Sequence, residues 1–180
     1  MITQAQYTMT FLGKPVTLVG HKLRIGDPAP EFQVVGPAFA PLTLADTEGC
    51  IRLVLTMPSL DAPNCDQAIQ HFSTALAEIG EVMLLVASMD LPFTLARWKA
   101  ATGNEDIYLL SDYQYGSLGK AFGVLIEELH LLAPAVFIIN ERNRIAYSQY
   151  GREVIGNLDY TASLSALRLV VNSPLRRPGG

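Results

Sequence analysis

The sequence has few cysteines and histidines and no long uninterrupted apolar run. Its 180 residues include 2 cysteines and 3 histidines, too few for a disulfide framework and without the Cys/His spacing of a zinc site. No stretch approaches the roughly 18 apolar residues of a membrane helix, and the polar start MITQAQYT has no secretory core. We therefore expect a cytoplasmic protein without a membrane partner, metal or cofactor, whose cysteines matter through redox chemistry.

Basic residues are also scarce. There are 13 lysines and arginines against 17 aspartates and glutamates, a net charge of -4. The one concentrated basic pair, Arg176 and Arg177, lies in a tail flanked by proline and glycine. A nucleic acid is not an expected partner, because its phosphates require a basic face.

Apolar residues make up 49% of the chain, enough for one sizeable core at this length. We expect a single domain over residues 1–172 and a disordered tail over 173–180. Residues 7–19 predict a hairpin. The remaining expected strands are 32–35, 51–57, 81–88, 108–110, 135–140 and 145–150, and the expected helices are 63–79, 92–102, 116–122 and 159–171. Apolar strands separated by helices, with a closing hairpin, predict an α/β thioredoxin-like fold with a central mixed sheet flanked by helices.

Seven segments, in order along the chain, carry a family resemblance. They are FLGKPVTLVG, IGDPAPEF, MPSLDAPNCD, SMDLPFTLARW, LLSDY, AFGVLI and LLAPAVFIIN. From Tyr7 to Val170 the chain resembles the thiol peroxidase (Tpx) branch of the peroxiredoxins. The resemblance implies a peroxide substrate, a reactive cysteine, and a homodimer that uses the loops around the active site.

The resemblance also implies roles for individual residues. In the family, a Pro-x-x-x-Thr-x-x-Cys loop opens a helix, and its cysteine thiolate attacks the peroxide. Here Pro58 shapes the loop and Cys65 is the peroxidatic nucleophile, but the threonine position holds Ala62. The family's active-site arginine falls on Pro134, and its resolving cysteine on Lys99. Because each lost donor typically costs about 10² to 10³ in rate, peroxide reduction is expected to be weakened.

The second cysteine, Cys50, is not expected to resolve an oxidised Cys65. The strand between them separates the two thiols by about 20 Å at roughly 3.3 Å per residue, whereas a disulfide needs Cα atoms within about 7 Å. Cys65, if oxidised, would need an external thiol or a cysteine of another subunit. If its helix starts at Pro63, Cys65 lies in the first turn, where the helix dipole favours a thiolate. Asp61 and Asp66 oppose this effect, and the net pKa shift is left open.

Ala62 and Pro134 also suggest a second interpretation. A thioredoxin-type site has alanine three residues before its nucleophile and a cis-proline facing it. This similarity predicts a cis Ala133–Pro134 peptide, with Cys65 as a monothiol because Ala68 stands where a second cysteine would be.

Other residues near these segments have structural and functional interpretations. Asp90 either caps a helix or shapes the pocket. Arg97 is expected on a solvated helix face, or as a positive charge near the site. Phe93 and Trp98 are expected to pack in the core or to form a dimer surface.

Two functions remain open. The first is a thiol peroxidase-like antioxidant oxidoreductase that reduces hydrogen peroxide or organic hydroperoxides through one cysteine, with an external thiol such as thioredoxin or glutathione. The second is a non-peroxidatic descendant that exchanges or binds thiols, or a redox-silent interaction module.

Overall fold

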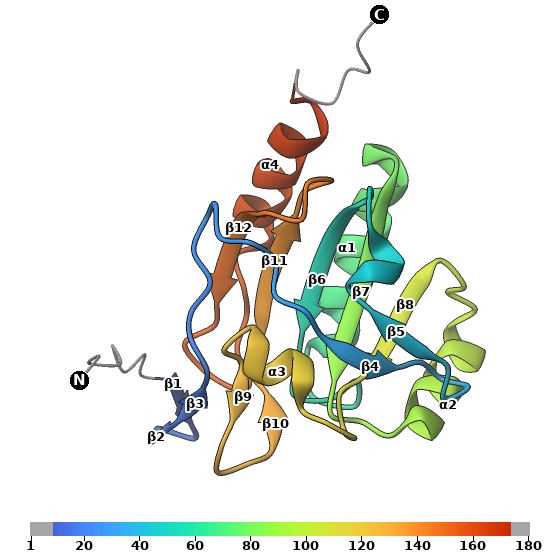
Figure 1. Ribbon diagram of the computed structural model, residues 1–180. Helices are drawn as coiled ribbons and strands as arrows, with labels where there is room; N and C mark the ends of the chain where they lie inside the picture. Colours follow the sequence, from blue (N-terminus) through green and yellow to red (C-terminus); the bar gives the residue numbers. More distant parts are fainter. Residues whose placement is uncertain (1–8, 174–180) are drawn as a thin grey trace, which may run out of the picture.

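The computed structural model describes residues 9–173, which form a seven-stranded mixed sheet with helices on both faces (Figure 1). The central sheet contains β4 (Gln33–Val35), β5 (Pro41–Thr43), β6 (Ile51–Thr56), β7 (Val82–Ser88), β8 (Ile107–Ser111), β11 (Ala135–Ile139) and β12 (Ile145–Tyr150). The helices are α1 (Cys65–Ile79), α2 (Pro92–Thr102), α3 (Ser117–Ala121) and α4 (Tyr160–Val171). This arrangement confirms the predicted α/β fold.

The order of the strands brings distant segments of the chain together at one end of the central strands. The order is β12-β11-β6-β7-β8-β4-β5, with β6, β7 and β8 parallel and β11 antiparallel to β6. Thr56, the last residue of β6, pairs with Ala87 on one side and with Ala135 on the other. The carboxyl ends of β6 and β7 therefore meet the amino end of β11, and the loops there can form one site.

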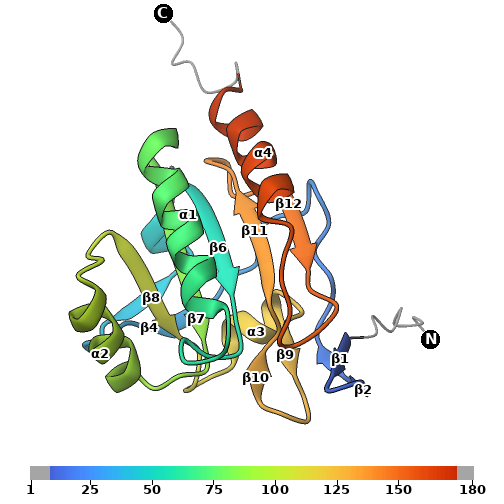
Figure 2. The same ribbon diagram turned by 180° about the vertical axis from the view of Figure 1, so that it is seen from behind.

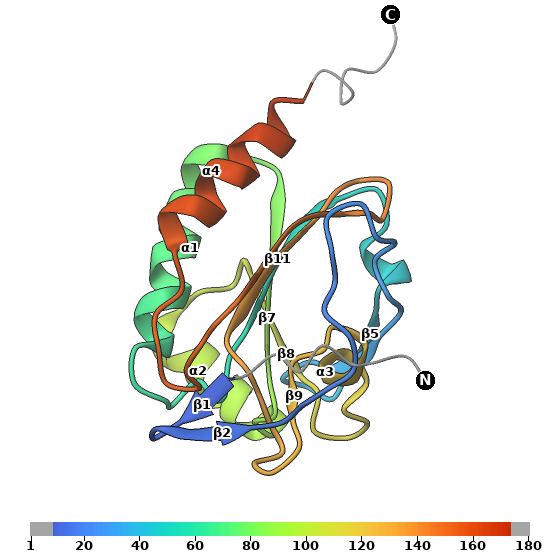
Figure 3. The same ribbon diagram turned by 90° about the vertical axis from the view of Figure 1, so that its left-hand side faces the viewer.

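Side chains of the central strands alternate between two apolar clusters. Leu53 and Leu55 of β6 pack with α1, α2 and α4, whereas Val54 packs on the opposite face with Leu118 and Phe122 of the α3 region. Figure 2 shows α1 and α4 in front of the sheet, and in Figure 3 these two helices lie to the left of the strands and α3 to the right. Both faces are buried, which explains why these strands are apolar throughout.

Small strands extend the fold beyond the predicted elements. The predicted N-terminal hairpin is present as β1 (Met9–Phe11) and β2 (Lys14–Val16), although residues 7 and 8 lie outside the described part. A second sheet, in the order β10-β9-β3, joins β3 (Leu18–Val19), β9 (Leu125–Ile126) and β10 (Leu131–Leu132). The sequence did not predict β5, β9, β10 or the 3-10 turn η1 (Ala45–Thr47).

One buried charge interrupts the apolar pattern of β6. The Arg52 side chain is fully buried near the amino end of the strand. Its guanidinium donates to the carbonyl of Thr47 at 2.7 Å, the carbonyl of Asn140 at 2.9 Å and Oδ1 of Asn143 at 2.7 Å. These bonds join η1 to the turn between β11 and β12, so the cation holds the sheet end together.

Within residues 9–173, no helix is long and apolar enough to cross a membrane. The tail predicted to be disordered lies outside the described residues except for Ser173.

Candidate active site

A tight loop carries the chain from β6 into α1 and places Cys65 at the first position of the helix. The backbone N–H of Ala62 donates to the carbonyl of Ser59, and that of Cys65 donates to the carbonyl of Ala62, both at 3.2 Å. Asn64 is the N-cap in a left-handed conformation, with φ 67° and no side-chain capping bond. The helix thus begins two residues later than the expected start at Pro63, because the Asn64 backbone is not helical.

The carboxylate of Asp90 fastens this loop to the end of β7. Its Oδ1 accepts from the Ser59 hydroxyl at 2.8 Å, and its Oδ2 accepts from the Leu60 backbone N–H at 2.7 Å. Oδ2 also accepts from the Ser88 hydroxyl at 2.8 Å. The expected helix cap was wrong, since the N-cap of α2 is Leu91. The alternative role, shaping the pocket, is the one that the contacts support.

Cys65 is a half-buried free thiol. Burial raises its pKa to about 11, and the charge of Asp90 acts in the same direction, whereas the Ser59 backbone N–H donates to the sulfur and lowers the pKa. The helix start and this single N–H do not offset the loss of water around the thiolate. The Cys65 pKa, whose direction of shift the sequence left open, is therefore raised. Burial is the main cause, and the carboxylate that adds to it is Asp90, not the neighbouring Asp61 or Asp66.

A narrow pocket opens beside the Cys65 sulfur. Its cavity volume is about 20 Å³, room for roughly one water molecule. Its walls combine the Cys65 loop, the start of β11 and the segment between β12 and α4; the lining side chains include Pro58, Pro63, Pro134, Ile155, Leu158 and Tyr160. The pocket is therefore mostly apolar and shields the thiol from solvent.

Pro134 lines this pocket, but its peptide bond is trans. The predicted cis Ala133–Pro134 bond was wrong, and the thioredoxin-like interpretation is withdrawn with it. The backbone runs extended into β11: the Thr56 hydroxyl donates to the Ala133 carbonyl at 2.7 Å, and the Gly151 N–H donates to the Pro134 carbonyl at 2.8 Å. These two bonds fit the course of a strand, for which a trans peptide is the ordinary geometry.

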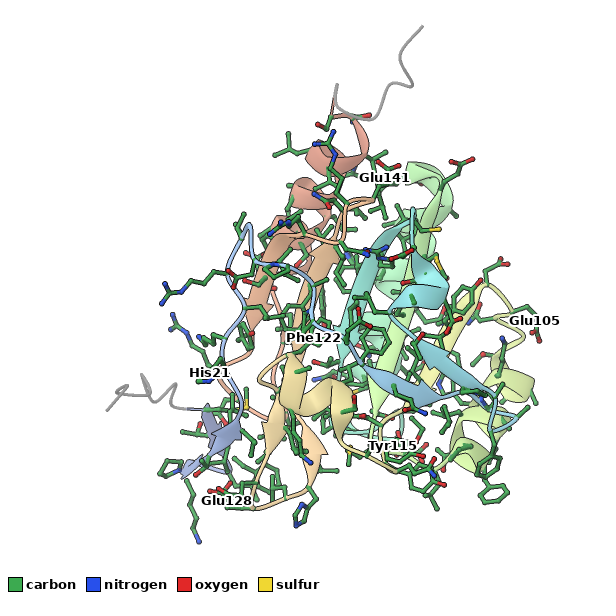
Figure 4. The ribbon with its side chains drawn as sticks, in the orientation of Figure 1. His21, Glu105, Tyr115, Phe122, Glu128 and Glu141 are labelled. Atoms are coloured by element: carbon green, nitrogen blue, oxygen red, sulfur yellow. The ribbon has the colours of Figure 1, made fainter. Side chains whose placement is uncertain are left out.

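Lys99 and Cys50 do not join the pocket. The ammonium of Lys99 donates to the carbonyl of Glu105 at 3.1 Å and pairs with its carboxylate at 3.3 Å. Figure 4 shows Glu105 at the outer edge of the molecule, beside β8. Cys50 is an exposed free thiol just before β6, at the opposite end of that strand from the Cys65 loop.

Comparison with known proteins identifies the family. The model of the AhpC/TSA family matches residues 25–148. The chain belongs to this family. It is 41% identical to a thiol peroxidase of Halalkalibacterium halodurans, over 89% of this chain and 97% of that protein. It is 38% identical to a thiol peroxidase of Bacillus subtilis, over 91% of this chain and 98% of that protein. The chain is thus a peroxiredoxin of the thiol peroxidase branch, as its sequence segments predicted.

Solved structures agree with this family assignment. A peroxiredoxin-like protein from Aquifex aeolicus superposes with a TM-score of 0.83 at 33% identity, covering 91% of this chain and 96% of its own. A thiol peroxidase from Chromobacterium violaceum superposes with a TM-score of 0.82 at 23% identity, covering 90% and 95%. The second likeness supports the fold.

The peroxiredoxin fold brings together only some of the residues predicted for the site. Pro58, Cys65 and Pro134 line the pocket, while Ala62 contributes its backbone to the turn before Cys65. Sequence reasoning missed Tyr160, which enters from α4, and no local motif announced it. Among residues 9–173, no three metal-ligating side chains gather as a metal site.

The helix α2 beside the site divides its residues between core and surface. Trp98 is buried, and its indole N–H donates to Asp66 Oδ1 at 3.1 Å, next to the reactive cysteine. Arg97 is exposed and forms a 3.0 Å ion pair with Asp61 of the loop. Phe93 is 69% exposed, and its ring packs on Phe39 with centroids 5.3 Å apart. Trp98 thus belongs to the core, and Phe93 remains a surface residue.

Proposed function

We propose that this peroxiredoxin reduces hydrogen peroxide or organic hydroperoxides through Cys65 alone. The observation that carries the proposal is the setting of Cys65 in a protein with close thiol peroxidase relatives. The thiol is the first residue of α1, receives a hydrogen bond from the Ser59 backbone N–H, and lines an apolar pocket. These features of the Cys65 loop are present although the family's threonine and arginine positions hold Ala62 and Pro134.

The reaction follows from a single thiol. The Cys65 thiolate forms a bond to one peroxide oxygen, the O–O bond breaks, and the product alcohol or water leaves with a proton. Cys65 becomes a sulfenic acid. A first external thiol then forms a mixed disulfide with Cys65 and releases water. A second external thiol displaces Cys65, which returns to the reduced state, and the external thiols leave as a disulfide.

The reductant is proposed to be external because neither candidate for an internal partner adjoins Cys65. The family's resolving position is Lys99, and Cys50 precedes the opposite end of β6. A thioredoxin-type protein or glutathione supplies the required thiols. Both are maintained in the reduced state in the cytoplasm, which is the compartment that we propose.

Rate and mass measurements on Cys65 test this proposal. Expressed per thiolate, because a pKa of about 11 leaves little of Cys65 ionised at neutral pH, the rate at which stoichiometric hydrogen peroxide adds one oxygen to Cys65 should exceed that of free cysteine. The single Trp98, bonded to Asp66 beside Cys65, offers a fluorescence signal. The Cys50→Ser variant should react like the original protein, whereas Cys65→Ser should lose the reaction. A rate no higher than that of free cysteine, or loss of reaction in Cys50→Ser, would contradict a Cys65 peroxidase.

Thiol exchange is the second candidate function. It is favoured by Ala62 and Pro134, since attack on a disulfide needs the Cys65 thiolate but not the donors that activate a peroxide. Oxidised glutathione distinguishes the two functions. Slow oxidation by peroxide with ready glutathionylation would favour exchange; if both reactions proceed no faster than with free cysteine, the protein is redox-silent.

We further propose a homodimer through the Phe39–Phe93 patch, defined as Phe39, Leu91 and Phe93. All three side chains are at least 45% exposed, and exposed apolar residues that gather beside an active site are typical of an interface. The measurement is the mass in solution by sedimentation. Phe93→Asp should shift the protein toward monomer, whereas the same substitution at the distant exposed Leu169 should not; a monomeric original protein would refute the dimer.

A further inference from the structure

The proposed peroxidase reaction requires a group that protonates the departing peroxide oxygen, and the residues described so far do not supply one. When the O–O bond breaks, the departing oxygen carries the electron pair as hydroxide or alkoxide. Hydroxide and alkoxide are strong bases, so this leaving group departs far more easily if it is protonated. The family's threonine and arginine positions hold Ala62 and Pro134, which have no side-chain donor.

Three side chains with O–H or N–H groups line the Cys65 pocket besides the thiol itself. They are Thr56, Asn64 and Tyr160. The Thr56 hydroxyl cannot donate its proton to a peroxide, because it already donates to the Ala133 carbonyl at 2.7 Å. Asn64 is exposed at the helix start, where water competes for its amide. Tyr160 is half-buried and is the remaining candidate.

Packing fixes the Tyr160 ring against the helix that carries Cys65. Tyr160 is the first residue of α4, directly after the N-cap Asp159, whose carboxylate accepts from the Ala162 N–H at 2.9 Å. The ring meets Phe72 edge-on, with centroids 5.4 Å apart. Phe72 lies two helical turns after Cys65 on the same side of α1. Figure 2 shows the chain descending from β12 past the start of α1 before α4 begins.

We propose that the Tyr160 hydroxyl protonates the leaving oxygen of the peroxide when Cys65 attacks, an inference that rests on the proposed peroxidase function. The sulfur lone pair forms the S–O bond, the O–O bond breaks, and the departing oxygen takes the phenol proton. Water then returns a proton to the phenolate. The products are a Cys65 sulfenic acid, an alcohol or water, and one hydroxide.

The electrostatics of the pocket suit this role. Burial raises the pKa of Tyr160, and the negative charge of Cys65 adds to the effect, so the phenol retains its proton at neutral pH. The influence of Cys65 also means that the two groups interact across the pocket. In the opposite direction, the Leu158 backbone N–H donates to the phenol oxygen. That hydrogen bond would stabilise the phenolate formed once the proton has been transferred.

Two oxidants with different leaving groups test the inference through Tyr160→Phe. The variant keeps the ring and its contact with Phe72 but lacks the hydroxyl. With hydrogen peroxide, the rate of Cys65 oxidation should fall roughly 10²-fold, as for loss of a general acid. With peracetic acid, the rate should be unchanged, because the departing carboxylate, with a pKa near 4 to 5, needs no proton.

The matched control is Tyr108→Phe, which removes the phenol hydroxyl of an exposed β8 side chain outside the Cys65 pocket. This variant should keep both rates. Equal loss with both oxidants in Tyr160→Phe would overturn the inference, because the residue would then act on the thiol or on the fold. No loss in Tyr160→Phe, or the same selective loss in Tyr108→Phe, would also overturn it. If the original protein oxidises no faster than free cysteine, the proposed function fails and the inference with it.

Discussion

The two ends of strand β6 place a cysteine in opposite electrostatic settings. At the amino end, Cys50 is exposed and lies two residues before the buried Arg52, whose guanidinium pKa is lowered by burial. At the carboxyl end, Cys65 is half-buried near the Asp90 carboxylate. The Arg52 cation is thus at the amino end of β6, whereas the reactive cysteine of the family, Cys65, follows the carboxyl end.

The comparison shows that Asp90 and Arg52 each stabilise the segments to which they are hydrogen-bonded. Asp90 binds the Cys65 loop through Ser59 and Leu60 and the end of β7 through Ser88, and Arg52 binds η1 and the β11–β12 turn. Each anchor fixes backbone that would otherwise be loose. Near Cys65, however, the anchoring charge has the sign that opposes ionisation of the thiol. Stability of the loop and reactivity of the thiol are therefore in conflict at this site.

The largest expected effect comes from restoring the family's donors beside Cys65. The Ala62→Thr, Pro134→Arg double substitution should raise the rate of Cys65 oxidation by peroxide about 10²-fold at neutral pH, because a donor and a cation are regained. Stopped-flow kinetics on single and double variants measures the gain. No gain would mean that other parts of the pocket have changed too far to use these groups.

The next effect concerns the opposite end of the strand. Arg52→Met keeps the apolar stem but removes the guanidinium hydrogen bonds to the carbonyls of Thr47 and Asn140 and to Oδ1 of Asn143, and should lower the free energy of unfolding by about 2 kcal/mol. Chemical denaturation measures it, with Arg152→Met as an exposed control. Cys65 in the folded variant should oxidise at the original rate. A changed rate would show that the two ends of β6 are coupled.

The smallest effect is expected at Asp90. Asp90→Asn keeps an oxygen for the Leu60 N–H and the Ser88 hydroxyl, while its amide can donate to the Ser59 hydroxyl. Removing the negative charge should lower the Cys65 pKa by less than about one unit, or about 1.4 kcal/mol. The Asp66 carboxylate accepts a hydrogen bond from Trp98, and the Asp66→Asn variant should leave the Cys65 pKa unchanged. A larger shift in Asp66→Asn would reverse this assignment.

The sequence predicted the elements whose patterns are local. Apolar spacing located α1 and β7 to within two residues, and Pro92 at the start of α2 marked that helix correctly. The strands β9 and β10 escaped prediction because two residues carry no periodicity, and their pairing with each other and with β3 is what defines them. Short strands are formed by tertiary contacts more than by propensity.

The site was less predictable than the fold because its chemistry depends on contacts between distant segments. The family motif located Cys65, Pro58 and Pro134. It could not reveal that Tyr160, nearly a hundred residues later, would line the same pocket. Nor could it give the sign of the Cys65 pKa shift, since burial is the largest cause and burial is a property of the folded chain.

The most direct test of this account is the pH dependence of Cys65 alkylation by iodoacetamide in the Cys50→Ser variant. Because only the thiolate reacts, a pKa of about 11 predicts a rate that rises about tenfold per pH unit from pH 7 to pH 10, without a plateau. A rate that is already constant above neutral pH would contradict the account. Cys65 would then be an activated thiolate despite its burial and the charge of Asp90.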